Sequence, residues 1–137
     1  MMRIVIVDTN ILFSSLLASG TKLREVLSNK SYNFYAPNFL IAEIFKHKNK
    51  ILKCTSATES EVNEFLVKSL QNIQFVNEGL ISTENFIQAY RLCGNVDEKD
   101  TPFVALTLEL DGSLWSRDKP LCQELTRKGF TAFFEME

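Results

Sequence analysis

Residues 4–10, Ile-Val-Ile-Val-Asp-Thr-Asn, contain the pattern that decides the fold. Four β-branched residues in succession predict a strand that is buried on both faces, which is typical of a parallel sheet covered by helices. In such sheets ligands bind outside the carboxyl ends of the strands. Asp8 directly follows the apolar run and is therefore expected to lie where chemistry takes place.

The remainder of the chain alternates between strand and helix patterns. We expect Asn10 to cap a helix that ends near Gly20, and the Thr58–Glu61 capping box to begin the clearest amphipathic helix. Further strands are expected at 32–35, 73–76, 113–116 and 130–134, and further helices at 22–27, 40–51, 82–94, 102–110 and 121–128. This order predicts an α/β/α sandwich with a mainly parallel sheet of about five strands. No repeat or linker divides residues 1–137, so we expect a single domain.

Composition limits the functions that the chain can have. It has 137 residues, of which 45% are apolar, enough for one domain with a core. Fifteen basic and 17 acidic side chains give a net charge of −2, whereas binding to nucleic acid regardless of sequence usually requires a strongly basic protein. A nucleic-acid substrate must then be held by local basic patches or by metal ions.

The cysteines and the first residues bear on the compartment. Cys54, Cys93 and Cys122 are odd in number and widely spaced, which favours buried thiols in a reducing compartment over disulfides or zinc ligands. Only four apolar residues separate Arg3 from Asp8, too few for a signal-peptide core or a membrane span. We expect a cytoplasmic protein.

Four of the five aspartates occur where strands end or helices begin; the fifth, Asp111, belongs to an Asp-Gly turn. Each of the four also has a purely structural interpretation. Asp8 could cap the helix at residues 10–11, Asp97 or Asp100 the helix at Pro102, and Asp118 the helix that starts at residue 119. Three separate segments with acids at equivalent positions favour a shared site over independent caps.

Glu43 adds a further acid close to the apolar side of its helix. A carboxylate there is costly unless it has a partner, so the alternative is a rim position or a pair with Lys46, His47 or Lys50. Two carboxylates about 4 Å apart repel by about 4 kcal/mol at an effective dielectric constant of about 20, so a cluster must take up a proton or a cation. An all-oxygen set of ligands suits Mg²⁺ or Mn²⁺, which activate water and stabilise phosphate charge. The acids therefore predict phosphodiester chemistry.

Four blocks of the sequence, in this order, resemble the PIN domain, a compact nuclease fold: residues 8–10 (Asp-Thr-Asn), 40–44 around Glu43, 97–106 with Asp97 and Asp100, and 114–119 with Ser116 and Asp118. The resemblance covers essentially the whole chain. It implies that Asp8, Glu43, Asp100 and Asp118 bind Mg²⁺ or Mn²⁺ directly or through water. Family members with the D-x-x-D spacing can use either or both of its acids, and we rank Asp100 above Asp97 as a metal ligand. It also implies that Asn10 and Ser116 orient the carboxylates and bound waters. Thr107 replaces a small Ala and Ser116 replaces the commoner Thr, and neither change removes a catalytic group.

Many bacterial PIN domains are toxins of type II toxin–antitoxin pairs that cleave RNA, are inhibited by a small antitoxin protein and commonly dimerise. The resemblance therefore implies a metal-dependent endoribonuclease with an RNA substrate, a homodimer and a small antitoxin as partner.

Basic side chains near these acids are the candidate contacts with RNA phosphates. Lys46 and Lys50 share a helix side with Glu43, and Arg117 and Lys119 flank Asp118. His47, four residues after Glu43, could ligate a metal, but its lysine-rich surroundings favour a solvated basic face. Most of the eleven Phe residues and Trp115 lie in stripes predicted to form the core, which favours packing over stacking on bases.

Two other classes of function remain open. A binding module for RNA or protein could retain the same scaffold without catalysis. A phosphotransfer protein could use Asp8 as nucleophile, but phosphatases of the haloacid-dehalogenase type need a second Asp where this chain has Asn10.

Overall fold

The computed structural model describes residues 3–17 and 20–136 and contains one four-stranded sheet in that part of the chain. Its strands are β1 (Arg3–Val7), β2 (Tyr32–Pro37), β3 (Ile73–Val76) and β4 (Ser113–Trp115). They lie in the order β3-β2-β1-β4, and all three pairings are parallel. The predicted mainly parallel sheet is confirmed.

The strand expected at residues 130–134 is present only as an isolated bridge between Phe133 and Leu114. Leu114 N donates to Ala132 O (2.8 Å), and Phe134 N donates to Leu114 O (2.9 Å). The ladder does not continue because Phe133 N donates to Thr131 O (2.9 Å) within the segment, and Phe134 packs edge-on against Trp115 at 5.2 Å. The sheet therefore has four strands, with the C-terminal segment beside β4.

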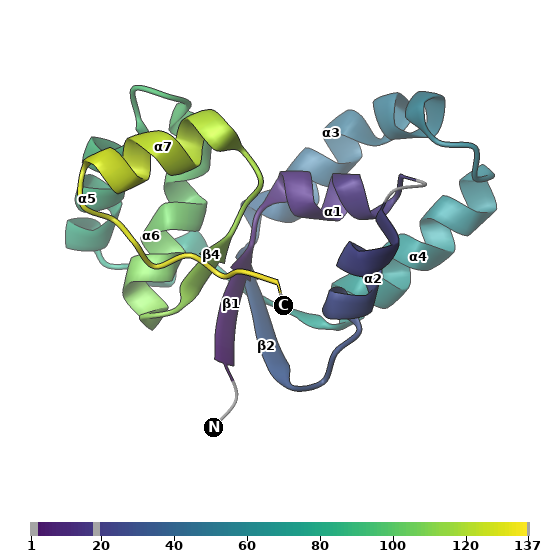
Figure 1. Cartoon of the computed structure of the whole chain (residues 1–137), viewed down its shortest axis with the longest axis horizontal. Coiled ribbons are helices and arrows are strands. Elements are labelled where there is room, and N and C mark those ends of the chain that lie inside the picture. Colours follow the sequence, from purple (N-terminus) through teal and green to yellow (C-terminus); the bar gives the residue numbers. More distant parts are fainter. Residues whose placement is uncertain (1–2, 18–19, 137) are drawn as a thin grey trace.

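Helices cover both faces of the sheet (Figure 1). On one side lie α1 (Thr9–Ser15), α2 (Thr21–Leu27), α3 (Phe39–Cys54) and α4 (Glu59–Gln71); on the other lie α5 (Thr83–Cys93), α6 (Thr101–Leu110) and α7 (Lys119–Arg127). Two short 3₁₀ helices, η2 (Glu78–Leu80) and η3 (Glu98–Asp100), precede α5 and α6. Within the described residues, no helix is both long enough and apolar enough to span a bilayer.

Local hydrogen bonds explain where several helices begin. The predicted capping box is present: Glu61 N donates to Thr58 Oγ1 (3.2 Å), and Thr58 N donates to Glu61 Oε1 (3.0 Å). The expectation that Asn10 caps the first helix is wrong, because Asp8 is extended and accepts from Ile11 N at 2.9 Å. Asn10 lies inside the first turn. Helix α1 ends at Ser15, and residues 18–19 of the expected stretch towards Gly20 lie outside the described residues.

The centre of the core is β1, where Val5, Ile6 and Val7 are fully buried. Strand β4 can approach β1 closely because residue 112 has no side chain. A Cβ at Gly112 would lie 2.8 Å from methyl groups of both Ile4 and Ile6. The predicted Asp111-Gly112 turn thus ends α6 and directs β4 alongside β1.

The strand order determines where a ligand can bind. From β1 the chain adds β2 and β3 on one side, and then returns to place β4 on the other side of β1. Between β1 and β4 the order reverses, and a crevice opens outside the carboxyl ends of strands at such a point. Asp8 and Ser116 directly follow these two strands.

Candidate functional site

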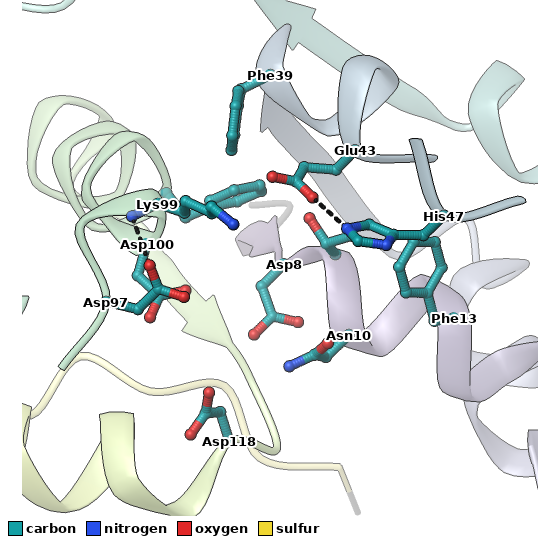
Figure 2. A pocket seen from close by; sticks show the side chains of 12 residues that line it. Asp8, Asn10, Phe13, Phe39, Glu43, His47, Asp97, Lys99, Asp100 and Asp118 are labelled. Carbon is teal, nitrogen blue, oxygen red and sulfur yellow. Dashed lines mark hydrogen bonds and ion pairs between the residues drawn. The ribbon is translucent and has the colours of Figure 1, made fainter. Parts of the chain in front are cut away.

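A pocket of about 190 Å³ lies at the carboxyl ends of β1 and β4 (Figure 2). In Figure 2, Asp8 is in the middle, Asp97 and Asp100 lie to one side, and Glu43 and Asp118 lie on opposite sides of Asp8. All five acids singled out in the sequence are therefore brought together. The lining residues are Asp8, Thr9, Asn10, Phe13, Phe39, Glu43, His47, Asp97, Lys99, Asp100, Phe103 and Asp118.

Asp8 is both a helix cap and an acid of the pocket. Its N–H donates to Trp115 O (3.3 Å), extending the β1–β4 pairing by one residue, and its Oδ1 accepts from Ile11 N. The residue is only 5% exposed, and this burial raises the pKa of Asp8 from 3.8 to about 6. Hydrogen bonds from the Ser116 side chain and from Ile11 N oppose the rise in pKa, and the charge of Asp118 adds to it. The capping and functional interpretations of Asp8 are compatible.

Ser116 connects the acids that follow the two central strands. Its hydroxyl oxygen accepts from Asp118 N at 3.2 Å, and its side chain lies close enough to the Asp8 carboxylate to lower the pKa of that group. Asp118 in turn caps α7, because its Oδ1 accepts from Leu121 N at 3.1 Å. One serine side chain thus contacts both Asp8 and Asp118, as an orienting residue would.

Asp97 and Asp100 occupy different environments although only two residues separate them. Asp97 is exposed, and its Oδ1 accepts from Lys99 N at 3.0 Å, which caps η3. Asp100 is half-buried, and its buried Oδ2 has no hydrogen-bond partner among the described residues. Burial, followed by the charges of Asp97, Asp118, Asp8 and Glu43, raises the pKa of Asp100 to about 7.

An unpartnered buried carboxylate oxygen beside further carboxylates needs a proton or a cation. Of the two acids, Asp100 therefore has the environment that better suits a proton or a cation.

Glu43 reaches the pocket from α3 and is 8% exposed. Its Oε2 lies 3.1 Å from His47 Nε2, one helical turn away, so the pair with His47 foreseen as an alternative does form. The Phe13 ring packs edge-on against the imidazole, with 5.9 Å between ring centroids. His47 and Phe13 together hold the Glu43 side chain at the pocket wall.

These side chains fit a hydrated divalent cation. Within residues 3–17 and 20–136, no three His, Cys, Asp or Glu side chains are arranged closely enough to enclose an ion by themselves. Mg²⁺, however, usually keeps several waters and binds one or two carboxylates together with substrate phosphate. The pocket supplies oxygen donors, a buried oxygen without a partner, and two acids with a raised pKa. Its chemistry therefore suits Mg²⁺ or Mn²⁺.

Sequence reasoning missed three aromatic residues of the pocket, although their spacing contained a signal. Residues three or four positions apart share one side of a helix. Phe13 follows Thr9 by four residues, Phe39 precedes Glu43 by four, and Phe103 follows Asp100 by three. A search for side chains one helical turn away from each predicted acid would have identified Phe39 and Phe103 but not Phe13, because Thr9 is not an acid.

Lys99 was also missed, because it lies within an acidic turn and follows no helical spacing. Its side chain points into the pocket from η3 (Figure 2). It is the only Lys or Arg among the described lining residues. A single ammonium group among five carboxylates is suited to contacting an anionic substrate.

The other predicted residues lie at different distances from the acids. Asn10 lines the pocket, whereas Lys50 lines a neighbouring hollow. Lys46 and Lys119 are exposed at the surfaces of α3 and α7, and Arg117 lines a separate hollow that includes Trp115 and Phe134. Of the four predicted RNA contacts, only Lys50 lies in a hollow that adjoins the acidic pocket.

Comparison with known proteins agrees with the fold. A model of the PIN domain family matches residues 6–128, and the chain belongs to that family. The resemblance found in the sequence is thus confirmed. No curated protein sequence matches the chain significantly.

Among solved structures, the chain is similar to one described as VapBC2 from Rickettsia felis bound to a DNA fragment from their promoter. The TM-score is 0.64 at 12% identity, and the match covers 88% of this chain and 92% of the other. At this identity the similarity concerns the fold.

Proposed function

We propose that the protein is a divalent-metal-dependent endoribonuclease that hydrolyses RNA phosphodiester bonds, with residues 1–137 acting as one nuclease domain. The observation that carries the proposal is the gathering of five acids around one pocket, including Asp100 with its buried, unpartnered oxygen. Membership of the PIN domain family, which is generally a nuclease family, supports it.

Each acid has a role in this proposal. Asp8, Glu43, Asp100 and Asp118 hold Mg²⁺ or Mn²⁺ directly or through water, and the exposed Asp97 assists at the rim. A bound ion of this kind activates water and stabilises the negative charge that develops on the phosphate. Near neutral pH Asp100, whose pKa is raised to about 7, would give up its remaining proton when the ion binds, whereas Asp8, whose pKa is raised to about 6, is already mostly ionised.

The remaining side chains position these groups and the substrate. Ser116 orients Asp8 and Asp118, and Asn10 orients bound water. Lys99 contacts the phosphate that enters the acidic pocket. The exposed Lys46, Lys50, Arg117 and Lys119 contact phosphates along the RNA, which offsets the net charge of −2.

A cleavage assay with matched variants tests the proposal. Asp100→Asn removes a carboxylate from the pocket, and Asp111→Asn makes the same chemical change at an exposed turn remote from it. With Mg²⁺ or Mn²⁺ we expect Asp100→Asn to lose at least about a hundredfold in the rate of RNA cleavage and Asp111→Asn to retain it. Full activity of Asp100→Asn, or cleavage in EDTA, would contradict the proposal.

We further propose that this nuclease is the toxin of a type II toxin–antitoxin pair acting in the cytoplasm. The PIN domain family and the structural similarity to VapBC2 support this. Induced expression should arrest bacterial growth, Asp100→Asn should not, and co-expression of a small protein encoded beside the gene should restore growth. Normal growth with the active wild-type enzyme would contradict a toxin role.

The partner surfaces are part of the same proposal. Five large apolar side chains are exposed on the described part of the chain, among them Phe45, Leu80 and Tyr90. A homodimer or an antitoxin would cover such side chains. Light scattering of the purified protein should give twice the monomer mass, and a monomer at micromolar concentration would contradict the dimer.

The alternative is a PIN-like module that binds RNA or protein without catalysis. The net charge and the lack of three pre-arranged donors in the described residues favour this alternative. Calorimetric titration with Mn²⁺ distinguishes the two functions. Binding that disappears in Asp100→Asn supports the nuclease, and no binding by the wild-type protein supports the module.

A further inference from the structure

A second pocket, of about 320 Å³, adjoins the acidic pocket between α1 and α3. We call it the α1–α3 pocket; it is lined by Asn10, Phe13, Ser14, Leu17, His47, Lys50, Ile51 and Cys54. Given the proposed nuclease function, we propose that it binds one nucleobase of single-stranded RNA, next to the phosphate held in the acidic pocket.

The two pockets share Asn10, Phe13 and His47, so a chain that occupies one can continue directly into the other. The edge-on contact between the Phe13 and His47 rings forms the wall between them. A phosphate among the acids would therefore have its neighbouring nucleoside at the α1–α3 pocket.

The acidic pocket and the α1–α3 pocket differ in the chemistry of their walls. The acidic pocket is surrounded by carboxylates, whereas Phe13, Leu17 and Ile51 give the α1–α3 pocket apolar walls. Asn10 adds an amide that bonds to no other residue within the described chain. Apolar walls with a few polar groups match the flat faces and polar edges of an unstacked base, which proteins bind in this manner. A volume near the lower end of ligand pockets, about 300–1,000 Å³, suits a single base.

Charge favours a nucleotide over a protein side chain in this pocket. Lys46, Lys50 and Lys53 are spaced by four and three residues along α3, and all three are exposed. Among the described residues none of them forms an ion pair, whereas Lys48 pairs with Glu59 at 3.6 Å. A row of unpaired ammonium groups beside an apolar pocket is complementary to a base followed by its phosphates.

Cys54 offers a direct test of occupancy, since it lines the α1–α3 pocket and is exposed, whereas Cys93 is buried. Alkylation of Cys54 by iodoacetamide is followed by mass spectrometry in EDTA, so that RNA is not cleaved. We expect a six-nucleotide single-stranded RNA to slow the reaction at least fivefold, and the base-free control ribose 5-phosphate to leave it unchanged. Comparison of the four nucleoside monophosphates then identifies the base that binds best.

Equal alkylation rates with and without the RNA would overturn the inference. Protection by the acidic aromatic peptide Glu-Glu-Phe-Glu-Glu but not by RNA would also overturn it and assign the pocket to a protein partner. Because the measurement needs no cleavage, it remains decisive even if the proposed nuclease activity is absent.

A variant that fills the pocket provides the second test. Cys54→Trp places a large ring in the α1–α3 pocket. The matched control, Cys54→Ser, leaves the volume of this pocket nearly unchanged. We expect Cys54→Trp to raise KM for RNA at least tenfold while leaving kcat unchanged, and Cys54→Ser to change neither. An unchanged KM for RNA in Cys54→Trp would contradict base binding, whereas failure of the wild-type protein to cleave RNA would contradict only the proposed function.

Discussion

Substitution of Asp8 by Asn is expected to stabilise the protein when no divalent ion is present. Burial raises the pKa of Asp8 from 3.8 to about 6. At 1.36 kcal/mol for each unit of pKa, the ionised carboxylate lowers the free energy of unfolding by about 3 kcal/mol above pH 6. Asn carries no charge and is equivalent to Asp as an N-cap, so the bond from Ile11 N to the side chain at position 8 is kept.

The sign of the effect gives it a characteristic pH dependence. An acid whose pKa is raised by folding binds its proton more tightly in the folded state, so the wild-type protein loses stability as the pH rises from about 4 through about 6. Asp8→Asn has no ionisable group at this position, so its stability does not fall in this way as the pH rises. We expect the variant to be more stable by about 1.5 kcal/mol at pH 5 and by about 3 kcal/mol at pH 8.

Urea unfolding in EDTA measures the difference, with the fluorescence of the buried Trp115 as signal. The exposed Asp111→Asn is the control, with an expected change within about 0.5 kcal/mol. Added Mn²⁺ should reverse the order once its concentration reaches about a thousand times its Kd, because the ion then stabilises the wild-type protein by about 4.1 kcal/mol. If Asp8→Asn is no more stable than the wild type at pH 8 in EDTA, the burial argument for Asp8 is wrong.

Two further predictions concern the acidic pocket and the fold that positions it. Since burial raises the pKa of Asp100 to about 7, the affinity for Mn²⁺ in calorimetry should rise between pH 5.5 and pH 8; a constant affinity over this range would show that Asp100 does not bind the ion. Gly112→Ala should lower the free energy of unfolding by about 1–3 kcal/mol, because its Cβ would lie 2.8 Å from Ile4 and Ile6. Urea unfolding checks this, and an unchanged midpoint would mean that β4 does not need so close an approach to β1.

Much of the fold could be predicted because its determinants are local. The apolar run at residues 4–7 becomes the buried strand β1, and the Thr58–Glu61 capping box begins α4. The segment at residues 130–134 has the same apolar character as a strand. Its aromatic side chains nevertheless pack into the core around Trp115, a tertiary contact that no local pattern specifies.

The acids of the site could be predicted by position, but their environments could not. Asp8 and Asn10 are both good caps, and only the backbone conformation shows that Asp8 accepts from Ile11 N. The sequence does not show which of Asp97 and Asp100 has a buried carboxylate oxygen without a hydrogen-bond partner. That difference depends on how η3 and α6 pack against the sheet, as does the position of Lys99 in the pocket.

Anomalous diffraction from crystals soaked in Mn²⁺ tests the central claim most directly. We predict an anomalous peak in the pocket bounded by Asp8, Glu43, Asp100 and Asp118, with carboxylate oxygens bound to the ion directly or through one water. A pocket that stays without a peak at saturating Mn²⁺, or acids that lie on separate surfaces, would contradict the claim.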